Sequence, residues 1–202
     1  MSISPPAARR HRSGGAMRRK PAGVLPAAIL VALAGTANTN ALTLSTPSAA
    51  YLQAGAGDHV ASAALGLRWD LDWYRENGWG RWEGNLDLSV GRWHPSRLSF
   101  ASGRHDVTQL GITPVIRLRP AGWRQLFLEA GIGANLLSPL YRNGSRQFST
   151  RFNFGDHIAL GWRFGASGEH ELALRVQHFS NGGAKHPNPG ENFIQLRYTR
   201  QL

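Results

Sequence analysis

The residues near the C-terminus offer the clearest chemistry in this chain. His178 and Ser180 stand two positions apart, and Glu191 follows at the end of a turn-rich loop. A serine hydroxyl becomes a nucleophile when a neighbouring imidazole takes its proton, and a carboxylate can orient that imidazole. These residue types therefore indicate ester hydrolysis by a serine hydrolase mechanism. Candidates for stabilising the oxyanion lie in the loop after the serine: Asn181, Gly182 and Asn188.

A His-x-Ser pair is a short motif that also arises by chance. At a membrane interface the same two side chains could simply hydrogen-bond to headgroups or water. The secondary structure that carries the pair is therefore needed to choose between the two interpretations.

Those elements are predicted to be β-strands. After Ala41 the apolar residues recur with a period of two, most clearly between residues 125 and 137. Many of the segments are about ten residues long, the length that a tilted strand needs to cross a bilayer. Eight strands are predicted, at residues 48–56, 60–73, 79–93, 107–119, 125–137, 152–164, 171–180 and 193–202.

The links between these segments alternate between short and long after the first one. Tight turns are predicted at residues 76–78, 120–122 and 166–168, and longer polar links at 94–105, 138–150 and 181–190. Several tryptophans lie near strand ends, as in the aromatic girdles of outer-membrane barrels. The fold predicted is all-β: an eight-stranded antiparallel up-and-down transmembrane β-barrel. A secreted lipocalin-like or sandwich protein is the soluble alternative.

The N-terminal segment has the pattern of an export signal. Basic residues at 18–20 precede an apolar run at 24–33, and small residues follow as far as Ala41. The run is too short for a spanning helix. We therefore expect residues 1–41 to be a removed signal peptide with an upstream extension, Met17 being a second candidate start. The barrel would then comprise residues 42–202.

More than half of the net positive charge of the chain lies in this segment. Six basic residues and no acidic ones lie within residues 1–41, so the remaining chain carries +5 of the total +11. Nucleic acid is therefore not an expected partner, whereas a phosphate-bearing or anionic membrane surface is. The chain has no cysteine, and its histidines do not show a metal-ligand spacing, so we expect neither disulfides nor a cofactor.

The alternation also indicates which face carries the candidate residues. On the seventh predicted strand Leu172, Leu174 and Val176 share one face. In a small membrane barrel the apolar face is the outer one, and the polar face fills the interior. Continuing the alternation places His178 and Ser180 on the lipid-facing side. If both termini are periplasmic, this pair lies near the extracellular end.

Hairpin register suggests the neighbours of this pair. Folding the sixth and seventh strands about their turn brings Asp156, also in phase with outward residues, roughly opposite His178 or Ser180. Folding the last hairpin brings Glu191 and Asn192 near Ser180. Strict alternation favours Asn192 on the outer face, although it need not hold for Glu191 at the loop end. Asp156 and Glu191 therefore both remain candidate acids.

The segment HFSNGGAKHPNPGEN, from His178 to Asn192, resembles the C-terminal signature of the lipid A 3-O-deacylases, the PagL family. Phe154 and Asp156 are similar to that family's Phe-x-Asp element on the sixth strand. The close resemblance covers residues 152–202. It implies an eight-stranded outer-membrane barrel with a Ser-His-Glu triad on its outer surface.

The resemblance also implies roles for individual residues. His178 would be the general base, Ser180 the nucleophile and Glu191 the orienting acid. In the family pattern the acid often stands one position later, which is Asn192 here, and Asp156 is then a competing acid or a supporting residue. The residues matching the family's asparagines near the oxyanion are Asn181 and Asn188.

The function expected is that of a bacterial outer-membrane esterase that removes the ester-linked acyl chain at the 3-position of lipid A. Lipid A or lipopolysaccharide of the outer leaflet and membrane lipids are the expected partners, and a homodimer is left open. Basic residues of the long links, Arg142, Arg146 and Lys185, could attract lipid A phosphates. The alternatives are an outer-membrane phospholipase or acyltransferase, and a structural or adhesive barrel without catalysis.

Overall fold

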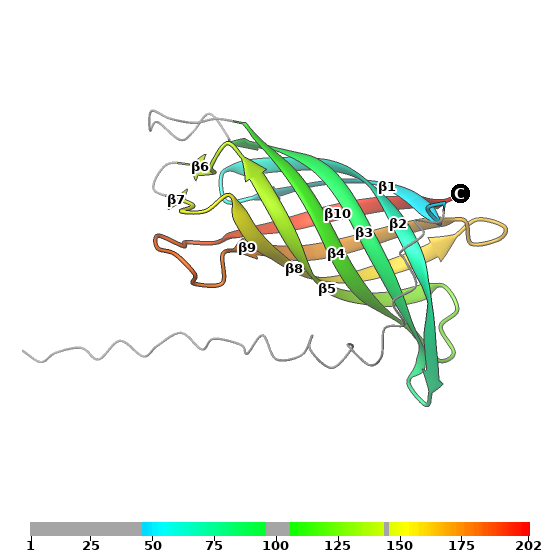
Figure 1. Cartoon of the computed structure of the whole chain (residues 1–202). Coiled ribbons are helices and arrows are strands. Elements are labelled where there is room, and N and C mark those ends of the chain that lie inside the picture. The colour runs from blue at the N-terminus through cyan, green and yellow to red at the C-terminus, as the bar shows by residue number, and fades with distance from the viewer. Residues whose placement is uncertain (1–45, 96–105, 144–145) are drawn as a thin grey trace, which may run out of the picture. The chain divides into compact units, whose positions relative to one another are not determined.

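The computed structural model describes residues 46–95, 106–143 and 146–202. The expected signal peptide and most of the 94–105 link lie outside these ranges. Eight antiparallel strands close into a barrel in the order β1-β10-β9-β8-β5-β4-β3-β2 (Figure 1). No helix within the described ranges is long and apolar enough to cross a membrane. The barrel strands are β1 (Ala49–Gly57), β2 (Val60–Asn77), β3 (Gly80–Pro95), β4 (Val107–Pro120), β5 (Leu126–Ser138), β8 (Phe152–Phe164), β9 (His170–Ser180) and β10 (Glu191–Gln201).

The predicted eight-stranded barrel is confirmed, with most strand ends within two residues of those expected. The largest difference is β2, which continues past residue 73 to Asn77 and carries a register irregularity between Asp70 and Tyr74. A second difference lies in the link between β5 and β8. Two short strands pair there, β6 (Arg142–Asn143) and β7 (Arg146–Gln147), which the alternation pattern is too brief to reveal.

The outer face of the barrel is apolar. Large aliphatic side chains stand exposed along every strand, and Ile158 and Ile194 keep 66% and 63% of their surface accessible. So broad an apolar band is typical of a surface covered by lipid. Representative members are Leu52, Leu65, Leu110, Leu128, Leu174, Val176 and Leu196.

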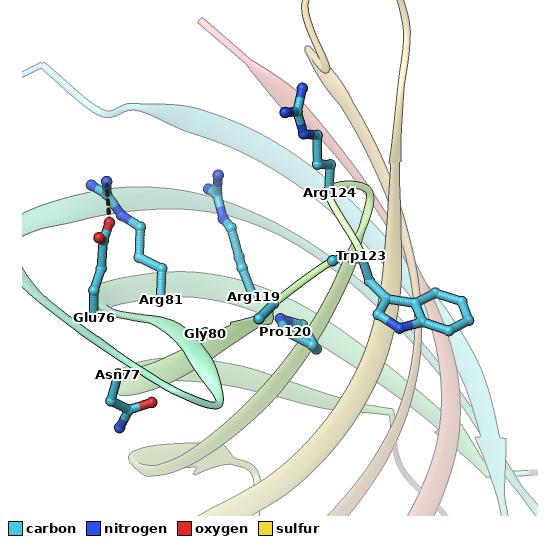
Figure 2. Close-up of a pocket in the computed structure, with 10 residues that line it drawn as sticks. Glu76, Asn77, Gly80, Arg81, Arg119, Pro120, Trp123 and Arg124 are labelled. Carbon is cyan, nitrogen blue, oxygen red and sulfur yellow. Dashed lines mark hydrogen bonds and ion pairs between the residues drawn. The ribbon is translucent and has the colours of Figure 1, made fainter.

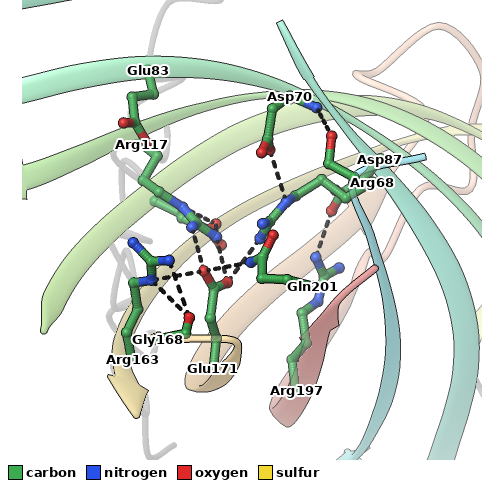
Figure 3. Close-up of polar contacts among 12 residues, drawn as sticks. Arg68, Asp70, Glu83, Asp87, Arg117, Arg163, Gly168, Glu171, Arg197 and Gln201 are labelled. Atoms are coloured by element: carbon green, nitrogen blue, oxygen red, sulfur yellow. Dashed lines mark hydrogen bonds and ion pairs between the residues drawn. The ribbon is translucent and has the colours of Figure 1, made fainter. Parts of the chain in front are cut away.

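Paired charged side chains lie buried in the interior of the barrel (Figure 3). The guanidinium of Arg117 donates to Glu129 at 2.6 Å and to Glu171 at 2.8 Å, and Arg68 donates to Glu171 at 2.7 Å. Arg197 donates to Asp87 farther along the interior. Buried charges are tolerated only when they are paired in this way. An eight-stranded barrel has an interior just wide enough for side chains to fill.

The two ends of the barrel differ. The turn end carries the short β2–β3, β4–β5 and β8–β9 connections, and the loop end carries the β5–β8 link and the β9–β10 loop. An aromatic plug fills the interior at the loop end: Trp93 packs on Tyr141 and Phe179, with ring centroids 5.2 and 4.7 Å apart. The plug also includes Val60, Val107, Leu137, Phe148 and Phe193.

Candidate active site

A row of polar side chains crosses three strands on the outer face at the loop end. His178 on β9 is directly opposite Asp156 on β8 and directly opposite Asn192 on β10. Ser180 lies one step nearer the loop end and is opposite Phe154. The side chains of this row alternate with buried neighbours along their strands, so they face outward as predicted.

The imidazole of His178 is held by an amide. Its Nδ1 lies 2.7 Å from Oδ1 of Asn192, a short hydrogen bond. Because the amide oxygen can only accept, Nδ1 carries the hydrogen and Nε2 is left as the acceptor. A neutral histidine in this tautomer can take a proton through Nε2.

Glu191 does not lie beside His178, contrary to the role that the resemblance implied. It precedes Asn192 in β10 and therefore points to the opposite side of the sheet, where its side chain is completely buried. There its carboxylate accepts a hydrogen bond from the Tyr141 hydroxyl at 2.8 Å. The physical reason is the two-residue period of a strand, since neighbouring residues face opposite sides.

Asp156 is exposed on the outer face, directly across from His178. Side chains that face each other across antiparallel strands have Cβ atoms about 5 Å apart. In the part of the chain that the structure describes, no hydrogen bond joins Asp156 to the His178 ring. Asp156 therefore places a carboxylate beside the imidazole without orienting it.

The Ser180 hydroxyl lies at the mouth of the β9–β10 loop. The backbone N–H of Gly182 points toward Ser180 Oγ at 3.4 Å. Among the described residues, no hydrogen bond joins Ser180 Oγ to His178. Phe154 flanks the serine and packs edge-to-face on Phe152, with ring centroids 5.2 Å apart. The serine thus sits between a backbone donor and an apolar wall.

The two asparagines predicted near the oxyanion serve to hold this loop. Asn181 donates from its backbone N–H to Oδ1 of Asn188 at 3.0 Å and from its side chain to the Lys185 carbonyl at 2.7 Å. Its Oδ1 accepts from the N–H of Gly183. With Asn181 committed to these bonds, Gly182 offers the backbone N–H nearest to the serine.

Gly190 gives the His178 ring its space. Its φ of +69° is a left-handed conformation that favours glycine. A Cβ atom at this position would lie 2.6 Å from Cε1 of His178, far inside ordinary contact. The imidazole therefore packs directly against the Gly190 backbone. In the sequence, Gly190 is visible only as the last residue of the predicted 181–190 link.

Three cavities of the described structure are lined by residues away from this row. One at the turn end is lined by Arg81, Arg119, Trp123 and Arg124, whose three arginines extend in the same direction in Figure 2. Arg81 is there engaged by Glu76 at 3.5 Å. Within the described ranges no group of three or more histidine and acidic side chains could hold a metal ion. The His178 row lies on the outer, lipid-facing surface of the barrel.

The structure describes a small outer-membrane type of barrel with a histidine and a serine on its lipid-facing surface. The model of the family "Lipid A 3-O-deacylase (PagL)" matches residues 47–201, so the chain belongs to that family. The resemblance predicted from the C-terminal segment is thereby confirmed.

Two relatives and one solved structure support the same assignment. Lipid A deacylase PagL of Bordetella bronchiseptica is 33% identical over 162 residues, which cover 78% of this chain and 85% of the relative. Lipid A deacylase PagL of Pseudomonas aeruginosa is 33% identical over 180 residues, covering 87% and 96%. The crystal structure of the outer membrane enzyme PagL superposes with a TM-score of 0.64 at 30% identity, over 76% of this chain and 99% of that one. The chain is an outer-membrane hydrolase that acts on ester bonds.

Proposed function

We propose that this protein removes the ester-linked acyl chain at the 3-position of lipid A, with Ser180 as nucleophile and His178 as general base. The observation that carries the proposal is the outward placement of both residues, with Nδ1 of His178 bonded to Asn192 at 2.7 Å. The relatives' names give lipid A as the substrate class. An acyl chain already in the outer leaflet can reach such a site by lateral diffusion.

The reaction proceeds through an acyl-enzyme. Ser180 Oγ attacks the ester carbonyl while Nε2 of His178 takes the hydroxyl proton. The tetrahedral intermediate collapses, the bond to the sugar oxygen breaks, and that oxygen receives the proton from His178. A water molecule, deprotonated by His178, then attacks the acyl-serine and releases the 3-hydroxy fatty acid. The serine regains its proton from the imidazolium.

Asn192 takes the place of the orienting acid in this scheme. An amide oxygen fixes the imidazole tautomer, as the asparagine of Cys-His-Asn hydrolases does. Because the amide is neutral, it stabilises the imidazolium less than a carboxylate would. Asp156, directly opposite His178, supplies a negative charge on the other side of the ring.

Gly182 is the proposed oxyanion donor. Its N–H is 3.4 Å from Ser180 Oγ, so an oxyanion formed on the carbon bonded to that atom lies within reach. Asn181 and Asn188 support this donor by fixing the loop through their mutual hydrogen bond of 3.0 Å. Their contribution is to loop geometry.

The substrate would lie along the outer face with the loop end toward the cell exterior. Phe152 and Phe154 offer an apolar wall for the acyl chain beside Ser180. Of the basic residues expected to attract phosphates, Arg142 and Lys185 are exposed, whereas Arg146 is engaged with Asp58 at 2.8 Å. Arg142 and Lys185 therefore remain available to lipid A phosphates.

We also propose that residues 1–41 direct export and are removed, which leaves residues 42–202 as the mature barrel. The basic run, the apolar segment and the small residues before Leu42 support this division. N-terminal sequencing of the membrane-inserted protein tests it, and a mature chain that still begins at residue 1 or 17 would contradict it.

Purified protein in detergent micelles tests the activity and its substrate. Lipid A should lose one 3-hydroxyacyl chain, and phospholipid vesicles without lipopolysaccharide should release no fatty acid. Ser180→Ala and His178→Asn should each lower the rate by at least about 1,000-fold. Release from the phospholipid alone would identify a phospholipase, and full activity of Ser180→Ala would exclude the proposed nucleophile.

A further inference from the structure

Glu191 is the most buried charged group near the active site, and the catalytic scheme leaves it without a role. Its side chain has 0% exposure, and it lies on the interior face directly behind the row of His178 and Asn192. A buried carboxylate is costly unless several donors satisfy it. Its contacts therefore show what it holds in place.

The donors to Glu191 come from three separate segments. The Tyr141 hydroxyl donates to Oε2 at 2.8 Å, and the backbone N–H of Asp58 donates to Oε1 at 3.3 Å. The backbone N–H of Asn192 also donates to Oε1, at 3.2 Å. Arg146 adds an ion pair, with Nη1 4.0 Å from Oε1. One carboxylate thus joins the β1–β2 turn, the β5–β8 link and the start of β10.

Arg146 holds the same segment from a second direction. Its Nη1 donates to the carbonyl of Gly190 at 3.1 Å, and its Nη2 pairs with Asp58 at 2.8 Å. Asn143 ties the link to the turn, because its Nδ2 donates to the Tyr141 hydroxyl at 3.1 Å and to the Asp58 carbonyl at 3.2 Å. We call Asp58, Tyr141, Asn143, Arg146 and Glu191 the mouth cluster.

The mouth cluster sits on the aromatic plug. Tyr141 packs on Trp93 and on Phe148, with ring centroids 5.2 and 5.1 Å apart. Burial and the adjacent Glu191 carboxylate raise the pKa of Tyr141 well above its ordinary value, so the phenol is a neutral donor. Hydrogen bonds in such a low-dielectric setting are strong and directional.

Both residues that define the position of the His178 ring are fixed by this cluster. Gly190, against which the ring packs, is held through its carbonyl by Arg146. Asn192, which bonds Nδ1, is held through its backbone N–H by Glu191. The mouth cluster therefore holds Gly190 and Asn192 from the interior face of the barrel, opposite the outer face that carries His178 and Ser180.

We propose that Glu191 is a positioning residue: with Arg146 and Tyr141 it fixes Gly190 and Asn192, and through them the imidazole of His178. This inference rests on the proposed function, because it assigns Glu191 to the geometry of the same site. It makes the β5–β8 link, on the interior side of the barrel mouth, a part of the catalytic apparatus. Movement of that link would displace the general base.

Paired variants at the two ends of the barrel test the proposal. Glu191→Gln replaces one of the two carboxylate oxygens with an NH2 group, which cannot accept a hydrogen bond from the donor now at that position. Glu171→Gln is the matched control, since Glu171 is 1% exposed and ion-paired but lies nine residues from Ser180 at the turn end. Nine residues of strand span about 30 Å. Folded protein is quantified by heat-modifiable gel mobility, and rates are measured on lipid A micelles per folded molecule.

Glu191→Gln should lower kcat by about 100-fold with KM within about threefold, as expected for a general base displaced by about 1 Å. Glu171→Gln should lower thermal stability while leaving kcat within about threefold. Tyr141→Phe, which removes one hydroxyl and keeps the packing, should give a smaller loss of kcat and serves if Glu191→Gln does not fold. Equal kcat values for wild type and both mouth-cluster variants would overturn the proposal.

A double-mutant cycle with Asn192→Ala separates positioning from general structural damage. If Glu191 acts through Asn192, adding Glu191→Gln to Asn192→Ala should cost much less than the about 100-fold that it costs in the wild type. Fully additive losses would overturn the proposal. Wild-type protein with no deacylase activity would instead refute the proposed function, so the two failures are distinguishable.

Discussion

Gly190→Ala tests the packing of the general base most sharply. An added Cβ would lie 2.6 Å from Cε1 and 3.3 Å from Nε2 of His178, whereas ordinary contacts begin at 3.4 Å. The ring must therefore move by about 0.8 Å, and a displacement near 1 Å can cost about 100-fold in rate. The left-handed φ of +69° adds about 1–2 kcal/mol of backbone strain.

Gly183→Ala is the matched control for this variant. Gly183 lies in the same loop at a φ of +84°, and nothing lies within 4 Å of a Cβ built on it. Both variants should lose similar stability in thermal unfolding, because both force alanine into a left-handed conformation. Only Gly190→Ala should lose about 100-fold in kcat on lipid A. Equal rates for the two folded variants would refute the packing of His178 on Gly190.

Four further predictions concern the orienting amide, the interior and the outer face. Asn192→Leu should lower kcat by roughly 100-fold because the imidazole loses its acceptor. Asn192→Glu should raise kcat above the wild-type value because a carboxylate stabilises the imidazolium. Steady-state rates on lipid A test both predictions. Arg117→Leu should destabilise the barrel by about 3–5 kcal/mol because it leaves buried carboxylates unpaired. Midpoints of thermal unfolding, read from gel shifts, measure this loss, and Arg142→Leu on the exposed link is the control. Ile158→Arg should cost about 2–4 kcal/mol on the lipid face, seen as reduced membrane assembly, whereas Ala121→Arg in a turn should assemble normally.

The sequence was sufficient to predict the barrel because its signal is local. Alternating apolar residues set each strand and its outward face, and turn residues set the hairpins. The same alternation predicts that Asn192 faces outward, whereas the resemblance to the family signature implied Glu191 as the acid. Neighbouring residues of a strand face opposite sides of the sheet. Assigning the acid to Glu191, one position before Asn192, therefore selects a side chain that faces the interior.

The mouth cluster could not be predicted in this way. Arg146 and Gly190 are 44 residues apart, and Asp58 and Glu191 are 133 apart, so their contacts depend on how the barrel closes. Nothing in the spacing of Tyr141 or Arg146 marks them as partners of the active-site segment. Gly190 was visible as a loop glycine, but its contact with His178 requires the register between β9 and β10. Contacts between side chains far apart in the sequence therefore follow only from the three-dimensional structure.

The central claim is that Ser180, on the lipid-facing surface, removes the 3-linked acyl chain of lipid A. It is tested most directly by mass spectrometry of lipid A from cells that express wild-type or Ser180→Ala protein at equal levels in the outer membrane. Wild type should remove the mass of one 3-hydroxyacyl chain, and Ser180→Ala should leave lipid A intact. Unchanged lipid A with folded wild-type protein, or the same loss with Ser180→Ala, would contradict the account.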